Sequence, residues 1–132
     1  MLKVEHIGIA VKSLNNSNKL FASLFGADHY KIEEVVSEHV NTSFFKIGDT
    51  KIELLEATDE SSAIAKFIEK KGEGIHHIAF EVENIEKEME RLSKEGFVIL
   101  NETPKIGADN KKVCFLHPKS TNGLLVELCQ EL

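Results

Sequence analysis

The strongest constraint on this fold is an internal repeat. The segment VEHIGIAV at residues 4–11 returns as IHHIAFEV at residues 75–82, so a shift of 71 positions superimposes His6 on His77. A chain of 132 residues is long enough for one ordinary domain with a core but too short for two. The two copies are therefore expected to share a single fold.

Each copy continues in the same way. A predicted helix follows each histidine strand, with apolar side chains at helical spacing and a terminating glycine, Gly26 in the first copy and Gly96 in the second. Further strands are predicted at VNTSFFKIG and TKIELLEA in the first copy, and at FVILNE, KKVCFLH and GLLVELCQ in the second. Neither copy could bury its sheet alone.

The predicted fold class is therefore α+β, with two tandem βαβββ modules forming a curved mixed sheet and the helices outside. The whole of residues 1–132 forms one domain in this interpretation. Module 1 spans about residues 1–58, a linker helix about 59–72, and module 2 about 73–132.

The last strand of each copy carries a matched acid, Glu53 in KIELLEA and Glu127 in LLVELCQ. Because alternate residues of a strand face opposite sides, both carboxylates are expected on the concave face of the sheet, together with His6 and His77. Two imidazoles and two carboxylates suit an open, catalytic divalent site better than structural zinc. The sequence thus predicts a metal cleft with His6, Glu53, His77 and Glu127 as ligands.

Other polar residues carry weaker predictions. His117, Lys119 and Lys105 are candidate substrate contacts, the lysines because they could meet an anionic group. His76 should face away from His77 and is interpreted as a structural or supporting residue. Cys114 and Cys129 lie on apolar strands and are expected to be buried thiols without a disulfide.

Composition narrows the class of partner. A formal net charge of −6 argues against nucleic acid or an anionic membrane as the main partner. No apolar run approaches the roughly 20 residues needed to span a bilayer, and the N-terminus has no signal-peptide pattern. A small-molecule substrate and a cytoplasmic location are expected.

The paired histidine strands and glutamate strands, from Val4 to Leu128, resemble the vicinal oxygen chelate superfamily. That resemblance implies two βαβββ modules, one metal ligand from each of four strands, and stabilisation of an enolate or enediolate. It also implies a homodimer.

Two families of the superfamily compete. The His-Glu-His-Glu set matches nickel-type glyoxalase I (lactoylglutathione lyase), whereas IELLEATDESSAIAKFIEKKGEGIHHIAFEV resembles methylmalonyl-CoA epimerases. Some epimerases carry a glutamate where this chain has Thr42. Nickel-type glyoxalases carry an arginine and an asparagine where it has Ala10 and Ala57.

The function expected from this resemblance is methylglyoxal detoxification by glyoxalase I. The hemithioacetal of methylglyoxal and glutathione would become S-lactoylglutathione, with Glu127 or Glu53 as the base and nickel preferred over cobalt or zinc. The alternative is a methylmalonyl-CoA epimerase that binds an acyl-CoA at the same metal site. The third possibility is a non-catalytic ligand-binding module.

Overall fold

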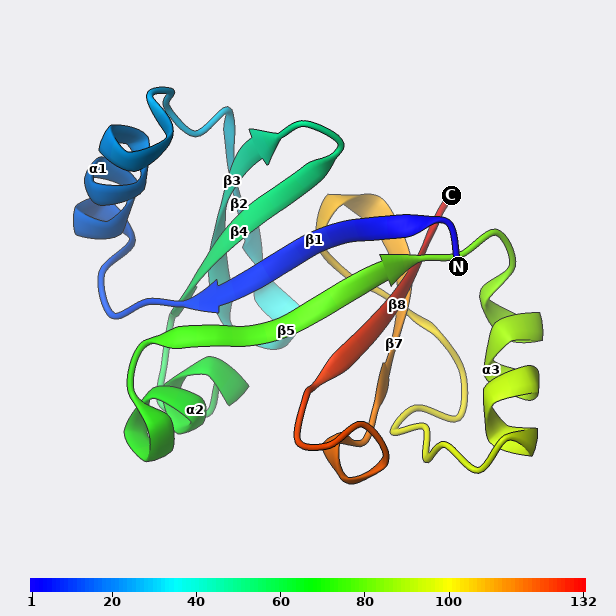
Figure 1. The fold of residues 1–132 in the computed structure, drawn as a ribbon. Coiled ribbons are helices and arrows are strands. Elements are labelled where there is room, and N and C mark those ends of the chain that lie inside the picture. The colour runs from blue at the N-terminus through cyan, green and yellow to red at the C-terminus, as the bar shows by residue number, and fades with distance from the viewer. The chain divides into compact units, whose positions relative to one another are not determined.

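The order of the elements is βαβββ, helix, βαβββ in a computed structural model that describes all of residues 1–132 (Figure 1). The first module contains β1 (Lys3–Ala10), α1 (Leu14–Phe25), β2 (Lys31–Val35), β3 (Val40–Ile47) and β4 (Thr50–Ala57). After α2 (Ala63–Lys71), the second contains β5 (Gly74–Glu81), α3 (Ile85–Lys94), β6 (Lys105–Ile106), β7 (Lys111–Leu116) and β8 (Val126–Glu131). The predicted α+β fold class with two βαβββ modules is confirmed.

Contacts divide the chain into two compact units whose borders fall inside β1 and β5. The central unit is Ile7–His76, and the terminal unit combines Met1–His6 with His77–Leu132. Each histidine strand thus gives its residues to both units. The division into modules at about residues 58 and 73 stays a prediction.

In the central unit the strand order is β2-β3-β4-β1, with antiparallel pairing of β3 to both β2 and β4. The α1 helix packs against one face of this sheet, where Phe45 and Leu54 are buried. Leu55, next to Leu54 and on the opposite face, packs with Ile64 of α2. The two helices therefore contact different faces of the central unit.

The ends of α1 follow from its sequence. The Ser13 side chain accepts a hydrogen bond from the backbone N–H of Asn16, which satisfies one of the free donors of the first turn. Gly26 ends the helix at a φ of 71°, a left-handed conformation that glycine adopts without steric cost. The predicted stop at Gly26 is confirmed.

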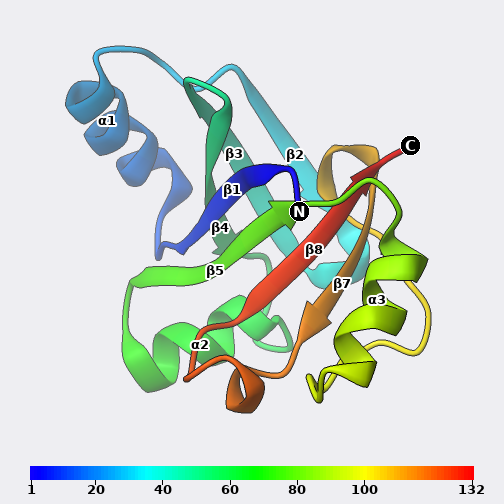
Figure 2. The same ribbon diagram turned by 45° about the vertical axis from the view of Figure 1, so that its right-hand side comes forward.

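In the terminal unit the strand order is β1-β5-β8-β7-β6. The β8 strand lies between β5, to which it is parallel, and β7, to which it is antiparallel, as Figures 1 and 2 show. Ile85, Met89 and Leu92 form an apolar stripe on α3 that is buried against Leu116 and Leu128. Because α3 covers the face that carries Leu128, Glu127 points to the other face.

One of the predicted strands does not form a continuous strand. The segment FVILNE contributes only an isolated bridge between Ile99 and Leu116, and the short β6 strand follows it. Phe97 and Ile99 still pack on the core beneath α3, while Val98 and Leu100 are exposed. The alternating pattern reflects burial of one side of the segment rather than continuous pairing.

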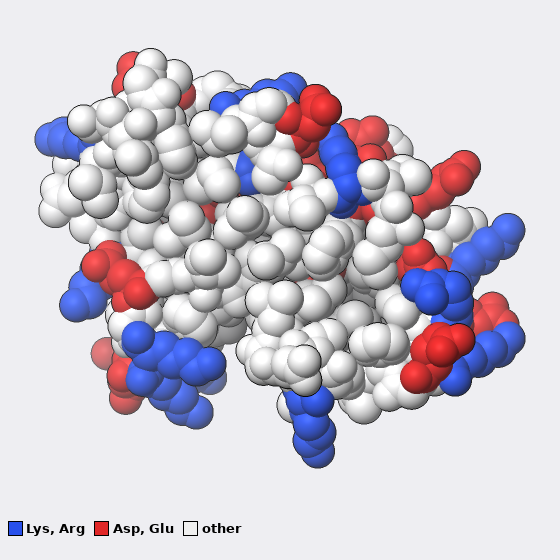
Figure 3. Space-filling view, viewed as in Figure 1, with Lys and Arg blue, Asp and Glu red and all other residues white.

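Basic side chains gather over α2, at the lower left of Figure 3. Lys70 and Lys71 lie in the last turn of that helix, where positive charge complements the helix dipole. None of the helices has the length and apolar character needed to cross a bilayer.

Candidate metal centre

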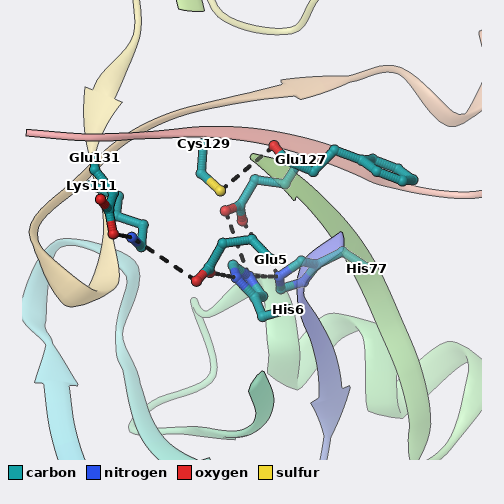
Figure 4. A network of polar contacts seen from close by, with 8 residues as sticks. Glu5, His6, His77, Lys111, Glu127, Cys129 and Glu131 are labelled. Carbon is teal, nitrogen blue, oxygen red and sulfur yellow. Dashed lines mark hydrogen bonds and ion pairs between the residues drawn. The ribbon is translucent and has the colours of Figure 1, made fainter. Parts of the chain in front are cut away.

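Three of the four predicted ligands meet in the terminal unit. His6, His77 and Glu127 are all buried, and their ligand atoms lie within 4.8 Å of one another (Figure 4). The two Nε2 atoms are 3.0 Å apart. Glu127 Oε2 is 3.5 Å from His6 Nε2, and Glu127 Oε1 is 3.4 Å from His77 Nε2.

Strand register produces this meeting. Glu127 pairs with Ala79 across the parallel β5–β8 ladder and with Phe115 across the antiparallel β7–β8 ladder. His77 precedes Ala79 by two residues and therefore faces the same side as Glu127. The Phe115 ring lies edge-on to the His77 ring, with the centroids 5.9 Å apart, and forms an apolar wall beside the ligands.

The spacing of the three groups fits a divalent ion. With ligand bonds of about 2.1 Å, neighbouring ligand atoms are about 3.0 Å apart at a right angle and about 3.4 Å apart at a tetrahedral angle. The distances of 3.0, 3.4 and 3.5 Å lie at or near these values. Two imidazoles and one carboxylate suit zinc, nickel, cobalt or iron, and leave coordination positions open for substrate.

Glu53, the fourth predicted ligand, is buried on β4 in the central unit. It pairs with Phe44 across the β3–β4 ladder, so it shares a face with Thr42. Thr42 is also buried, and its hydroxyl has no hydrogen-bond partner. The role of Glu53 as a ligand or base stays a prediction.

Sequence reasoning missed two buried charged residues beside the ligands. Glu5 Oε1 lies 2.6 Å from His6 Nδ1, and Glu5 Oε2 lies 4.0 Å from the Lys111 ammonium. Strict strand alternation would direct Glu5 away from His6, so the strand pattern alone does not predict this contact. The available signal was an acidic residue directly before the histidine.

The predicted substrate contacts differ in position. The Lys105 ammonium lies 5.9 Å from the centre of the Phe115 ring, which itself contacts His77. His117 Nδ1 instead accepts a hydrogen bond from the Lys119 backbone at a tight turn, Pro118–Ser120. Of the three candidates, Lys105 is the one that these contacts connect to the metal ligands.

His76 and the two cysteines have structural surroundings. The His76 ring packs edge-on against Phe67, and burial, together with the nearby Lys71 charge, lowers its pKa to about 4. Both cysteines are buried and free, as predicted. Burial, reinforced by the charge of Glu127, raises the pKa of each thiol.

Comparison with known proteins identifies the relatives of this chain. The sequence profile of the glyoxalase/bleomycin resistance protein/dioxygenase superfamily matches residues 5–115. The mitochondrial methylmalonyl-CoA epimerase of Dictyostelium discoideum is 44% identical over 127 residues, which are 96% of this chain and 76% of that protein. The ethylmalonyl-CoA/methylmalonyl-CoA epimerase of Cereibacter sphaeroides is 42% identical over 130 residues, 97% of each protein.

A solved structure agrees with these sequences. A Streptomyces coelicolor methylmalonyl-CoA epimerase variant in complex with 2-nitronate-propionyl-CoA has a TM-score of 0.95 and 31% identity to this chain. The match covers 99% of this chain and 95% of that one. This relative therefore binds an acyl-CoA ligand.

These relatives correct the expected function. The prediction of glyoxalase I, with its lyase reaction and methylglyoxal detoxification, is wrong, because the relatives are methylmalonyl-CoA epimerases. The ligand set could not separate the two activities, since the same imidazoles and carboxylates can hold a metal for either substrate. The relatives are enzymes, in agreement with the prediction of an enzyme rather than a non-catalytic module.

The fold, the buried cluster of two histidines and one glutamate, and the match over residues 5–115 lead to one assignment. This chain belongs to the glyoxalase/bleomycin resistance protein/dioxygenase superfamily.

Proposed function

We propose that this protein is a metal-dependent acyl-CoA epimerase that interconverts the two C2 epimers of methylmalonyl-CoA. The observation that carries the proposal is the buried cluster of His6, His77 and Glu127 in a chain whose relatives are methylmalonyl-CoA epimerases. A divalent ion held there supplies Lewis acidity, which lowers the cost of negative charge on the oxygens of a bound substrate.

The reaction needs two proton transfers at one carbon. Removal of the C2 proton leaves an electron pair that spreads onto the thioester oxygen, and a proton returned to the opposite face of C2 gives the other epimer. A single base that returned the proton to the same face would only restore the starting molecule. Two acid/base groups on opposite faces are therefore required.

We propose Glu127 and Glu53 as the candidate acid/base groups. Both are buried carboxylates at equivalent positions of the repeat. Thr42, which occupies the place of a glutamate in some epimerases, cannot serve as a carboxylate base. Its buried hydroxyl lies on the same face of the β3–β4 ladder as Glu53, where it could hydrogen-bond a substrate oxygen.

Lys105 is proposed to contact the free carboxylate of the substrate. Its ammonium group is exposed and lies over Phe115, beside the ligand His77. The metal is proposed to be nickel, with cobalt or zinc as alternatives. The protein is also proposed to be a cytoplasmic homodimer.

Hydrogen exchange at C2 tests the mechanism. Metal-loaded protein is incubated in D2O with one epimer of methylmalonyl-CoA, and deuterium uptake and epimer ratio are followed separately. Wild-type protein should show both inversion and exchange. Glu127→Gln and Glu53→Gln should each abolish inversion. With a single epimer as substrate, only the variant whose remaining carboxylate faces the C2 proton should still exchange that proton with solvent.

The exposed Glu102→Gln is the matched control, because it removes a carboxylate of the terminal unit that has no role in the proposal. It should retain both inversion and exchange. Wild-type protein that binds divalent ions yet shows neither process would overturn the proposed function. Full inversion by Glu127→Gln would overturn the assignment of that base.

A further inference from the structure

A line of alternating charges runs from the protein surface to a metal ligand (Figure 4). Glu131 is exposed, and its Oε1 lies 3.3 Å from the ammonium of Lys111, which is 5% exposed. Lys111 approaches Glu5, which is 2% exposed and contacts His6. All four residues belong to the terminal unit.

The contact between Glu5 and His6 decides which nitrogen of the imidazole can bind a metal. A carboxylate at 2.6 Å accepts a hydrogen bond from Nδ1–H, so the neutral ring carries its proton on Nδ1. Nε2 then keeps a free electron pair, and this atom faces His77 and Glu127. A carboxylate behind a histidine ligand also makes the imidazole a stronger donor and fixes the ring orientation.

Lys111 makes this arrangement tolerable in the interior. A buried carboxylate without a compensating charge is costly, and the buried ammonium supplies that charge. The β7–β8 register fixes its place, because Lys111 pairs with Glu131 and lies on the same face of the sheet as Glu127 and Cys129.

The same ammonium argues against a second metal ion here. Glu5, His6 and Cys129 also lie within 4.8 Å of one another and could in principle hold an ion. The Lys111 cation, 4.0 Å from Glu5, would repel a second cation, and the Cys129 thiol donates instead to the Phe80 carbonyl. Glu5 is therefore better placed to support His6 than to bind a second ion.

The residue directly before the histidine differs between the two halves of the repeat. The shift of 71 positions that superimposes His6 on His77 places Glu5 on His76. His76 packs against Phe67 and is not a carboxylate. The repeat therefore does not place a carboxylate directly before His77.

We propose that Glu5, held in place by Lys111, is a positioning residue that fixes His6 as an Nε2 ligand of the metal. The proposal rests on the metal site of the proposed function but not on its substrate. Glu5→Gln should weaken binding of zinc or cobalt about 10-fold to 100-fold, the usual loss when such a supporting carboxylate is removed.

Metal affinity is measured directly, by competition with a chromogenic chelator, and the His6 tautomer by ¹⁵N NMR of the metal-free protein. Wild-type protein should show the Nδ1–H form of His6, and Glu5→Gln should weaken this preference, because a neutral amide oxygen is a poorer acceptor than a carboxylate. Because neither measurement uses acyl-CoA, a failure of the epimerase proposal would leave both results interpretable.

Two further variants separate positioning from stability. Glu5→Gln leaves the Lys111 ammonium without its buried partner, so Glu5→Gln/Lys111→Met removes both charges and should recover folding while metal binding stays weak. Glu86→Gln is the matched control, because Glu86 pairs with Lys112, the neighbour of Lys111 on the other face of β7. It should bind metal within about twofold of wild type.

Two results would overturn the proposal. One is metal affinity of folded Glu5→Gln within twofold of wild type. The other is an Nε2–H tautomer of His6 in the metal-free wild-type protein.

Discussion

Thr42 and Ser43 are neighbouring buried hydroxyl residues on β3 for which opposite mutational effects are expected. The Thr42 hydroxyl has no partner, whereas the Ser43 hydroxyl donates to Asn18 Oδ1 at 2.6 Å. A buried hydroxyl without a hydrogen bond costs about 1–3 kcal/mol by mutational measurement. Thr42→Val keeps the shape of the side chain and removes that cost.

We expect Thr42→Val to stabilise the protein by about 1–2 kcal/mol and Ser43→Ala to destabilise it by about 1 kcal/mol. The entropy of unfolding is about 2.1 cal/mol/K per residue near 60 °C, so for 132 residues 1 kcal/mol corresponds to about 4 °C. Tm should therefore rise by about 4–7 °C in Thr42→Val and fall by about 4 °C in Ser43→Ala.

Calorimetric or circular-dichroism melts of both variants test this reasoning. A loss of 1 kcal/mol or more in folded Thr42→Val would refute it, since that hydroxyl would then have a stabilising partner. The same variant also tests the proposed substrate contact. If the hydroxyl binds a substrate oxygen, the more stable protein should have a several-fold lower kcat/KM, and unchanged kinetics would remove Thr42 from the site.

Three other outcomes are expected. Lys105→Met should raise the KM for methylmalonyl-CoA several-fold with kcat within twofold, and an unchanged KM in steady-state assays would count against the carboxylate contact. Removal of the metal by a chelator should lower Tm, because an ion at 100 times its Kd adds about 2.7 kcal/mol to the free energy of unfolding. In thermal melts of His77→Ala, added metal should not raise Tm. The lowered pKa of His76, about 4 against 6.5, means that the unfolded chain binds the proton first as pH falls, so stability is kept above pH 6.5 and lost below it. Urea unfolding of metal-free protein should show a loss of about 2 kcal/mol between pH 7 and pH 5 that His76→Phe lacks; equal pH slopes in both proteins would contradict the assignment.

The repeat made most of the fold predictable. Each module begins with an equivalent strand. The following helices end close to the predicted glycines, α1 at Phe25 before Gly26 and α3 at Lys94 two residues before Gly96. These boundaries follow from spacing and stop signals that act locally. The segment FVILNE was less predictable, because an alternating pattern shows which side of a segment is buried but not whether a neighbour pairs with its backbone.

The three clustered candidate ligands were more predictable than the charged residues beside them. His6, His77 and Glu127 occupy positions that the repeat marks, whereas Glu5 and Lys111 have no such mark. Glu5 reaches His6 because its flexible side chain can turn back along the strand, which the alternation of Cβ directions does not exclude. The substrate could not be predicted from the candidate metal ligands, because different enzymes of one superfamily can use the same ligands for different substrates.

The distribution of the terminal unit along the chain has a consequence for biosynthesis. Its first six residues leave the ribosome early, but their neighbours from residue 77 onward are made much later. The hairpin of β3 and β4 is local and can form during translation, whereas His6 must wait for Glu127. The cluster of His6, His77 and Glu127 can therefore form only after β8 has been made, and a nascent chain stalled before β8 would present two imidazoles without the carboxylate of Glu127.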